Sequence, residues 1–169
     1  FEGVGSRGLP WLSSVQKIHH LPVAVEVANA RHVEEALKAE LKVLWVGART
    51  TVSPFAVQEI ADALKGVDIP VMVKNPINPD VPLWLGALER LNRAGIEQLV
   101  AIHRGFSSYD KRFRYAPNWE LPIELKTQAP EVPLICDPSH ISGVRKNILP
   151  IAQKALDLDM DGLMLEVHP

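Results

Sequence analysis

The sequence predicts an α/β protein built as a TIM (β/α)8 barrel, with about six of the eight βα units present in residues 1–169. Short apolar, β-branched runs alternate with longer amphipathic stretches, which is the pattern of right-handed βαβ units. Polar residues recur where these runs end, at intervals of 23 to 36 residues. A barrel of about 250 residues has a similar repeat of about 31 residues and places its functional groups at that same strand edge.

Six segments have the composition of buried strands, being short, apolar and bounded by turn residues. We expect strands at Pro22–Val27, Val43–Val46, Val71–Lys74, Leu99–His103, Pro133–Cys136 and Gly162–Val167.

Helices are expected between these strands. Their apolar residues recur at helical spacing, and the expected ranges are Gly8–Ile18, Arg31–Ala39, Pro54–Leu64, Val81–Ala94 and Asn147–Leu158. Ser53 and Pro54 form an N-terminal signal, and Gly95 is suited to a helix C-terminus. Residues 105–117 are predicted to form one long irregular connection.

An open doubly wound sheet is the alternative, and it also binds ligands beyond the carboxyl ends of its strands. No glycine-rich dinucleotide fingerprint follows any expected strand. The sequence therefore favours the barrel, as a single domain over residues 1–169.

The composition excludes several classes of protein. The 169 residues carry 18 Lys and Arg against 20 Asp and Glu, a net charge of −2 that gives no general attraction to nucleic acid or anionic lipid. No apolar run approaches the roughly 18 residues that span a bilayer. A single cysteine excludes an internal disulfide and suits a reducing compartment, so we expect a cytoplasmic protein.

Three cations end three consecutive expected strands: Arg49, Lys74 and Arg104. In a barrel such strand ends converge, so their charges would surround one anion, for which arginine offers a planar fork and lysine a point charge. The alternative is that each cation pairs with a nearby carboxylate, such as Glu26, in a structural network.

His140 follows the fifth expected strand, and Glu166 ends the sixth. Imidazole and carboxylate together suit a divalent metal ion, and His168 is a further candidate by proximity. A histidine acting as a general base, or one with a purely structural role, fits this pattern equally well.

Side chains alternate along a strand. If Asp137 and Arg104 face the barrel interior, the preceding Cys136 and His103 face the helices. We expect Trp11, Trp45, Trp84 and Trp119 to pack between sheet and helices. The basic cluster Lys111, Arg112 and Arg114 either binds a phosphate or is a solvated loop.

Five segments in order resemble the strand ends of the 3-deoxy-D-arabino-heptulosonate 7-phosphate (DAHP) synthases, specifically the compact type I-beta group. They are Gly47–Thr51 (GARTT), Val73–Pro76 (VKNP), Ala101–Phe106 (AIHRGF), Cys136–His140 (CDPSH) and Leu165–Pro169 (LEVHP). GARTT and HRGF also separate the chain from the related 3-deoxy-octulosonate 8-phosphate synthases.

The resemblance implies an enzyme of the shikimate pathway, which supplies aromatic amino acids. That enzyme, a 3-deoxy-7-phosphoheptulonate synthase (an aldol-type transferase), condenses phosphoenolpyruvate with erythrose 4-phosphate and releases phosphate. It implies that Arg49, helped by the Ala48 backbone, and Arg104 bind phosphoenolpyruvate, and that Lys74 is both a ligand of it and a proton donor. His140 and Glu166 would be two of four ligands of a divalent metal ion, manganese or a similar ion.

The resemblance has departures. The family's cysteine and aspartate metal ligands and its lysine-proline-arginine-threonine segment have no match within the chain, and Tyr115 stands where relatives tend to carry asparagine. We therefore expect a core fragment with an incomplete ligand set and slow or absent turnover. An octulosonate synthase and a non-catalytic barrel scaffold remain the alternatives. An incomplete barrel leaves two sheet edges unpaired, so we expect either that the parent chain supplies the missing strands or that a partner chain covers these edges in a homo-oligomer. Some relatives carry a fused chorismate mutase domain, which the parent protein could share, although no segment of residues 1–169 resembles that helical unit.

Overall fold

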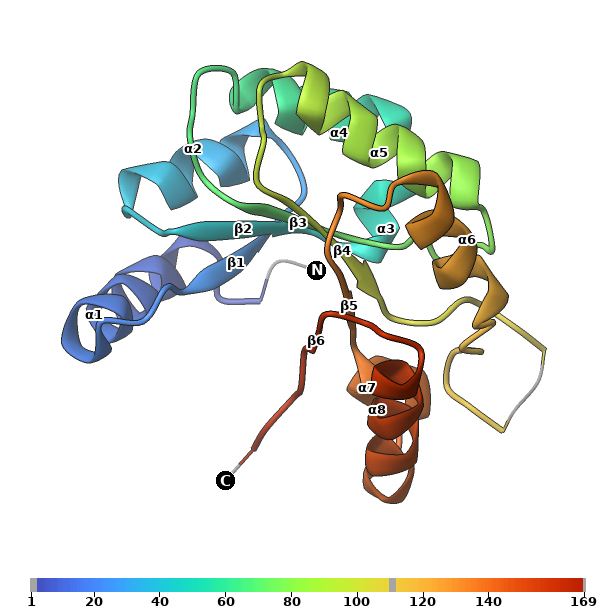
Figure 1. Ribbon diagram of the computed structural model, residues 1–169. Helices are drawn as coiled ribbons and strands as arrows, with labels where there is room; N and C mark the ends of the chain where they lie inside the picture. The colour runs from blue at the N-terminus through green and yellow to red at the C-terminus, as the bar shows by residue number, and fades with distance from the viewer. Residues whose placement is uncertain (1–2, 110–111, 169) are drawn as a thin grey trace.

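The computed structural model describes residues 3–109 and 112–168, and its centre is a parallel sheet of six strands (Figure 1). The strands are β1 (Ala24–Val27), β2 (Val43–Val46), β3 (Val71–Lys74), β4 (Leu99–His103), β5 (Leu134–Cys136) and β6 (Gly162–Leu163). They lie side by side in sequence order, and each neighbouring pair is parallel. An open doubly wound sheet reverses its strand order at a switch point, so this unbroken order confirms the barrel arrangement of the six units.

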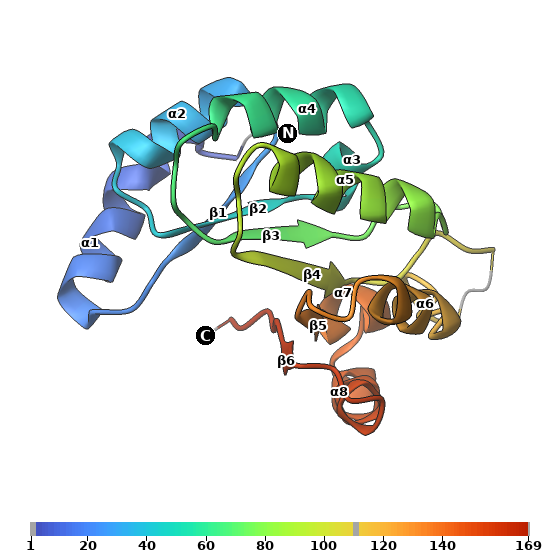
Figure 2. The ribbon, with the colours of Figure 1, turned by 45° about the horizontal axis from the view of Figure 1, so that its top comes forward.

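Helices occupy the connections between the strands. They are η1 (Gly5–Gly8), α1 (Leu9–His19), α2 (Ala30–Lys38), α3 (Ala48–Thr51), α4 (Pro54–Ala63), α5 (Val81–Arg93), α6 (Glu120–Gln128), α7 (Pro138–Ser142), η2 (Arg145–Asn147) and α8 (Ile148–Asp157). Figure 2 shows α2, α4 and α5 together on one face of strands β1 to β4. The opposite face is therefore the inner face of the barrel.

Local sequence signals explain where several helices begin and end. The Ser53 hydroxyl accepts a hydrogen bond from the Ala56 amide, with Pro54 in the first turn of α4, as predicted. The Asp80 carboxylate caps α5 in the same way by accepting from the Leu83 amide. Gly95 follows the end of α5 with a φ of +99°, the left-handed conformation that glycine adopts at low cost.

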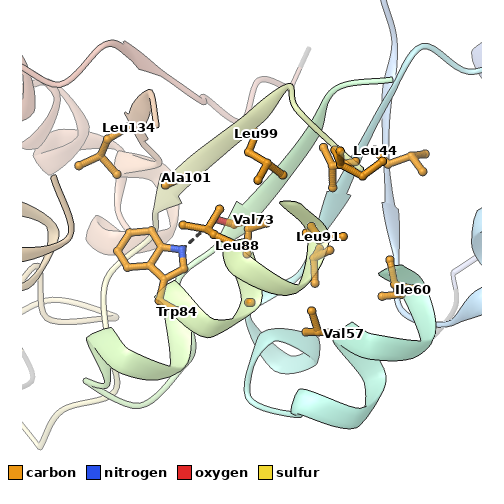
Figure 3. Packing of buried hydrophobic residues seen from close by; sticks show 14 of the residues in the cluster. Leu44, Val57, Ile60, Val73, Trp84, Leu88, Leu91, Leu99, Ala101 and Leu134 are labelled. Carbon is orange, nitrogen blue, oxygen red and sulfur yellow. Dashed lines mark hydrogen bonds between the residues drawn. The ribbon is translucent and has the colours of Figure 1, made fainter. Parts of the chain in front are cut away.

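The core lies between the sheet and its helices (Figure 3). Val46, Val73, Ala101 and Leu134 are in register on neighbouring strands and are all buried on the helix side. Trp84 of α5 is fully buried among them and donates its indole N–H to the Val73 carbonyl at 3.1 Å. Each such buried aliphatic side chain contributes about 1.5–3 kcal/mol by its removal from water.

Two of the four tryptophans do not occupy the predicted layer. Trp84 and Trp119 pack against the core, as expected. The prediction for Trp11 is wrong, because its side chain is largely exposed on α1. The prediction for Trp45 is also wrong. Trp45 pairs with Glu26 and Met72 on the neighbouring strands, and because side chains alternate along a strand, these residues face away from the buried helix side.

The chain also differs from the predictions in several helices and in the length of β6. The short helices α3 and α7, which follow β2 and β5, were not expected. Helix α6 was not expected, because its short sequence contains Pro122 and a weak apolar stripe. Strand β6 ends at Leu163, four residues before the expected end, and pairs only with β5 within the described residues. No helix within residues 3–109 and 112–168 is long and apolar enough to cross a bilayer.

Candidate functional site

The predicted site residues all lie at the carboxyl edge of the sheet, because the six strands are parallel. Lys74 is the last residue of β3, and Arg104 directly follows β4. Ala48 and Arg49 open the short helix α3 after β2, His140 lies in α7 after β5, and Glu166 follows β6. The contacts at this edge form two groups, one centred on Asp137 and one centred on Arg104.

Asp137 is the centre of the first group. Its Oδ2 lies 3.0 Å from the Lys74 ammonium and 2.9 Å from Nδ1 of His140, while its Oδ1 accepts from the His140 amide and so caps α7. Burial alone would raise the pKa of this carboxyl, but the hydrogen bond from His140 and the charge of Lys74 outweigh it and lower the pKa to about 2. Asp137 therefore stays ionised and fixes the positions of both neighbours.

Lys74 is buried, with a carboxylate on one side and an aromatic ring on the other. Its ammonium lies 5.9 Å from the centroid of the Trp45 ring, within the range of a cation–π interaction. The Trp45 indole N–H donates to the Glu26 carboxylate at 3.0 Å. Glu26 therefore pairs with Trp45, and the carboxylate that partners Lys74 is Asp137.

Gly47 lies directly against the Glu26 carboxylate. A Cβ at Gly47 would lie 2.2 Å from Oε1 of Glu26, so only a glycine lets the chain enter α3 without displacing that carboxylate.

Arg104 is the centre of the second group. Its backbone amide donates to Oδ1 of Asn75, and the Asn75 side-chain amide donates to the carbonyls of Pro76 and Gly105. This buried asparagine fixes the loops that follow β3 and β4. The Arg104 guanidinium is itself buried, and its Nε and Nη1 atoms have no hydrogen-bond partner among the described residues.

Tyr115 lies against Arg104 and is influenced by the charge of Arg49. Its ring centroid lies 3.6 Å from the guanidinium carbon of Arg104. A hydrogen bond from Arg104 and the positive charges of Arg104, Arg114 and Arg49 lower the pKa of the Tyr115 phenol. Arg49 is exposed and forms no ion pair with another described residue. Within residues 3–109 and 112–168, the arginine side of the edge thus carries positive charge that forms no ion pair with a carboxylate.

The metal-ligand candidates are close together but few. Nδ1 of His140 lies 3.6 Å from Oε1 of Glu166, and the Glu166 amide donates to the Ser139 hydroxyl. Among the residues that the structure describes, no three His, Cys, Asp or Glu side chains form a group that could hold a metal ion. The donor chemistry of His140 and Glu166 fits two ligands of a divalent ion, and His168 lines the same hollow as Glu166.

The residues that precede the site residues face the other way, as alternation predicts. Cys136 is fully buried, and burial together with the charge of Asp137 raises the pKa of its thiol to about 12. His103 is fully buried between Phe106 and Trp119, and desolvation lowers its pKa to about 3. Neither group reaches the inner face.

Sequence reasoning gave no contact role to Asp137, Asn75 or Tyr115 at this edge. Asn75 directly follows Lys74, and a polar residue at that position is a signal for a buried strand-end contact. Tyr115 lies in the connection expected to be irregular, where no periodic pattern points to it. Of the basic cluster, Arg114 packs against Gly143 and faces Tyr115, whereas Lys111 lies outside the described residues.

Comparison with known proteins gives a consistent result. The model of the DAHP synthetase I family matches residues 1–169. A phospho-2-dehydro-3-deoxyheptonate aldolase of Thermotoga maritima is 23% identical over 170 residues, which is 100% of this chain and 48% of that protein. A 2-dehydro-3-deoxyphosphooctonate aldolase of a Synechococcus strain is 24% identical over 184 residues, covering 100% of this chain and 62% of that protein.

Solved structures share the fold. A truncated 3-deoxy-D-arabino-heptulosonate 7-phosphate synthase of Thermotoga maritima superposes with a TM-score of 0.86 at 20% identity, over 99% of this chain and 61% of that one. A DAHP synthase structure from the same organism gives a TM-score of 0.87 at 20% identity, over 98% and 47%. The chain therefore spans about half to three-fifths of the length of these relatives.

Proposed function

Because the chain belongs to the DAHP synthetase I family, we propose that it carries the phosphoenolpyruvate site of a DAHP synthase. The observation that carries the proposal is the second group of contacts, in which the positive charges of Arg49 and Arg104 both lower the pKa of Tyr115 and neither arginine forms an ion pair with a carboxylate among the described residues. Unpaired guanidinium donors at a strand edge suit a phosphate or carboxylate. A site that only stabilised the fold would pair them.

The proposed roles follow from the contacts. Arg49 and Arg104 bind the phosphate of phosphoenolpyruvate, aided by the backbone at Ala48. Lys74 binds its carboxylate and supplies a proton to the aldehyde oxygen of erythrose 4-phosphate, because Asp137 keeps the ammonium in place at 3.0 Å. The new carbon–carbon bond joins C3 of phosphoenolpyruvate to the aldehyde carbon, and phosphate leaves after water adds at C2.

His140 and Glu166 are proposed as two ligands of a divalent metal ion, manganese or a similar ion. When bound, such an ion polarises the aldehyde or a water molecule. Asp137 contributes by orienting the imidazole of His140, as carboxylates beside metal-ligating histidines do.

Binding of phosphoenolpyruvate tests the anion site directly. We expect Arg49→Gln and Arg104→Gln each to weaken binding about tenfold to a hundredfold in isothermal titration calorimetry, since each removes charged hydrogen bonds to the ligand. Arg93→Gln, on the exposed face of α5, is the matched control and should bind as the unchanged chain does. Equal affinity for all four proteins would refute the assignment.

Turnover tests the reaction. Release of phosphate from phosphoenolpyruvate is measured with manganese and either erythrose 4-phosphate or arabinose 5-phosphate. The proposal expects a preference for erythrose 4-phosphate and loss of release in the presence of a chelator. A preference for arabinose 5-phosphate would assign the octulosonate reaction, for which the Synechococcus relative is named. Binding of phosphoenolpyruvate without any release would favour a non-catalytic barrel.

We also propose a cytoplasmic homo-oligomer. Strands β1 and β6 each have one neighbour within the described residues, and free strand edges favour association unless they are covered. Light scattering on the purified chain measures this, and a monodisperse monomer would contradict it. Fusion to chorismate mutase stays a prediction about the parent gene.

A further inference from the structure

Tyr115 is held in place by its backbone on two sides. Its amide donates to the Ile141 carbonyl of α7, and the adjacent Ala116 exchanges two hydrogen bonds of 2.8 Å with Phe106, which follows β4. A Cβ at Gly105 would lie 2.8 Å from the Cβ of Tyr115, so the two segments are in close contact. The position of the tyrosine ring is therefore set by the fold.

The ring covers one face of a buried guanidinium. The ring centroid lies 3.6 Å from the guanidinium carbon of Arg104, which corresponds to direct stacking. Arg104 is 6% exposed, and its Nε and Nη1 donors are buried without an acceptor among the described residues. Stacking holds the plane of the guanidinium, and the Nε and Nη1 groups at its edge are left without an acceptor among the described residues.

The phenol lies in a field of positive charge. The charged groups that act on it are Arg104, Arg114 and Arg49, which come from three separate segments of the chain. Arg114 lies 5.6 Å from the ring, while its aliphatic stem packs on Gly143. A phosphate bound to these arginines and an ionised phenol would compete for the same charges.

We propose that Tyr115 is a positioning residue of the anion site, which holds the Arg104 guanidinium flat and shielded from water so that its N–H edge can bind a phosphate or carboxylate. This inference rests on the anion site proposed above and adds a residue that the strand-end motifs do not assign. An apolar ring would supply the stacking alone, whereas the phenol also couples anion binding to pH.

Three variants separate the ring from the hydroxyl. Tyr115→Ala removes both, and we expect phosphoenolpyruvate to bind about tenfold more weakly, since a desolvated cation–π contact is lost. Tyr115→Phe keeps the ring and should bind within about twofold of the unchanged chain near neutral pH. Tyr115→Leu covers the guanidinium without an aromatic face and is the second variant if the alanine protein does not fold. Tyr109→Phe, at a fully exposed tyrosine, is the control.

A spectroscopic titration measures the pKa of the Tyr115 phenol, which anion binding would not change if the residue had a purely structural role. The chain has two tyrosines, so in Tyr109→Phe the phenolate absorbance reports Tyr115 alone. We expect ionisation below the ordinary value of 10.0. Saturating phosphoenolpyruvate or inorganic phosphate should move the titration upward, because the bound anion offsets the arginine charges that favour phenolate.

The outcomes distinguish this inference from the proposed function. Equal anion affinity in the unchanged chain, Tyr115→Ala and Tyr115→Leu, or no upward shift on saturation, overturns the role of Tyr115 while leaving the anion site intact. Binding of inorganic phosphate but not phosphoenolpyruvate, with loss in Tyr115→Ala, supports the role of Tyr115 and refutes the proposed substrate. Binding of neither anion refutes both.

Discussion

The ammonium of Lys74 and the carboxylate of Asp137 lie 3.0 Å apart, although 63 residues separate them in the chain and both are buried. The contact joins the end of β3 to the segment that follows β5 across the inner face of the sheet. A buried ion pair of this kind is costly to break, because removing one partner leaves the other charge without compensation.

Replacement of Asp137 by asparagine should therefore destabilise the chain by about 3 kcal/mol, since it leaves Lys74 buried without its counter-charge. Urea unfolding at pH 7 measures this change. Glu89→Gln breaks an exposed ion pair with Arg93 and is the control, expected to cost less than about 1 kcal/mol. Equal losses in the two variants would show that the buried pair contributes no more than a surface pair.

The low pKa of Asp137 also predicts a contribution to acid stability. Its pKa is about 2 in the folded chain against 3.8 ordinarily, so the unfolded state binds the proton first as the pH falls. The resulting stability of about 2 kcal/mol is complete above the ordinary value and is lost between about pH 4 and pH 2. Unfolding midpoints across this range should fall less steeply in Asp137→Asn than in the unchanged chain.

The lowered pKa of His103 predicts a separate loss of folding stability in milder acid. The buried ring stays neutral in the folded chain down to about pH 3, whereas an unfolded histidine binds a proton near pH 6.5. Stability should therefore decrease as the pH falls from 6.5 towards 4, because the unfolded state binds more protons there. His103→Leu should flatten this decrease, and His19→Gln, outside the core, should not. An identical decrease in all three proteins would exclude His103 as its source.

The close approach of Gly47 to Glu26 predicts that substitutions at these two positions have coupled effects on the free energy of unfolding. Gly47→Ala should displace the Glu26 carboxylate, break its hydrogen bond with Trp45 and cost about 1 kcal/mol. The same change in a Glu26→Ala background should cost much less, because the clash is then gone. A double-mutant cycle on unfolding free energies measures the coupling, and additive costs would contradict it.

Cys136 should be unreactive in the folded chain. Its thiol is fully buried, and its pKa of about 12 leaves almost no thiolate at neutral pH. A chromogenic disulfide reagent should react with one thiol per chain only after urea is added. Rapid reaction without denaturant would show that the strand opens locally.

The strand–helix alternation could be predicted because each strand is a short apolar run, as Val43–Val46 and Val71–Lys74 are in both sequence and structure. Inner and outer faces could also be assigned at the strand ends, since His103 and Cys136 follow the period of two. Helix α6 could not, because packing against α5 rather than its own amphipathic pattern stabilises it. The end of β6 could not be predicted either, because an extended segment is a β-strand only where a neighbouring strand forms hydrogen bonds with it.

For the candidate site, the positions of Arg49, Lys74 and Arg104 at one edge followed from parallel strands alone. The partner of Lys74 could not be predicted in this way, because Glu26 and Asp137 are both strand-end carboxylates and only three-dimensional packing selects between them. The role of Tyr115 could not be predicted either, since its place depends on the backbone bridge between Phe106 and Ala116 and on the hydrogen bond from its own amide to the Ile141 carbonyl. Contacts made through loops carry no periodic signal in the sequence.

The unbroken order of the six strands bears on how the chain folds during synthesis. Each new strand pairs with the strand made just before it, so a growing chain on the ribosome can add one βα unit at a time to a surface that already exists. Late segments need not displace early ones, and the contact of Lys74 with Asp137 can form only after the segment that follows β5 has been made. At a synthesis rate of about 5–20 residues per second, each βα unit has seconds in which to pair with the unit before it.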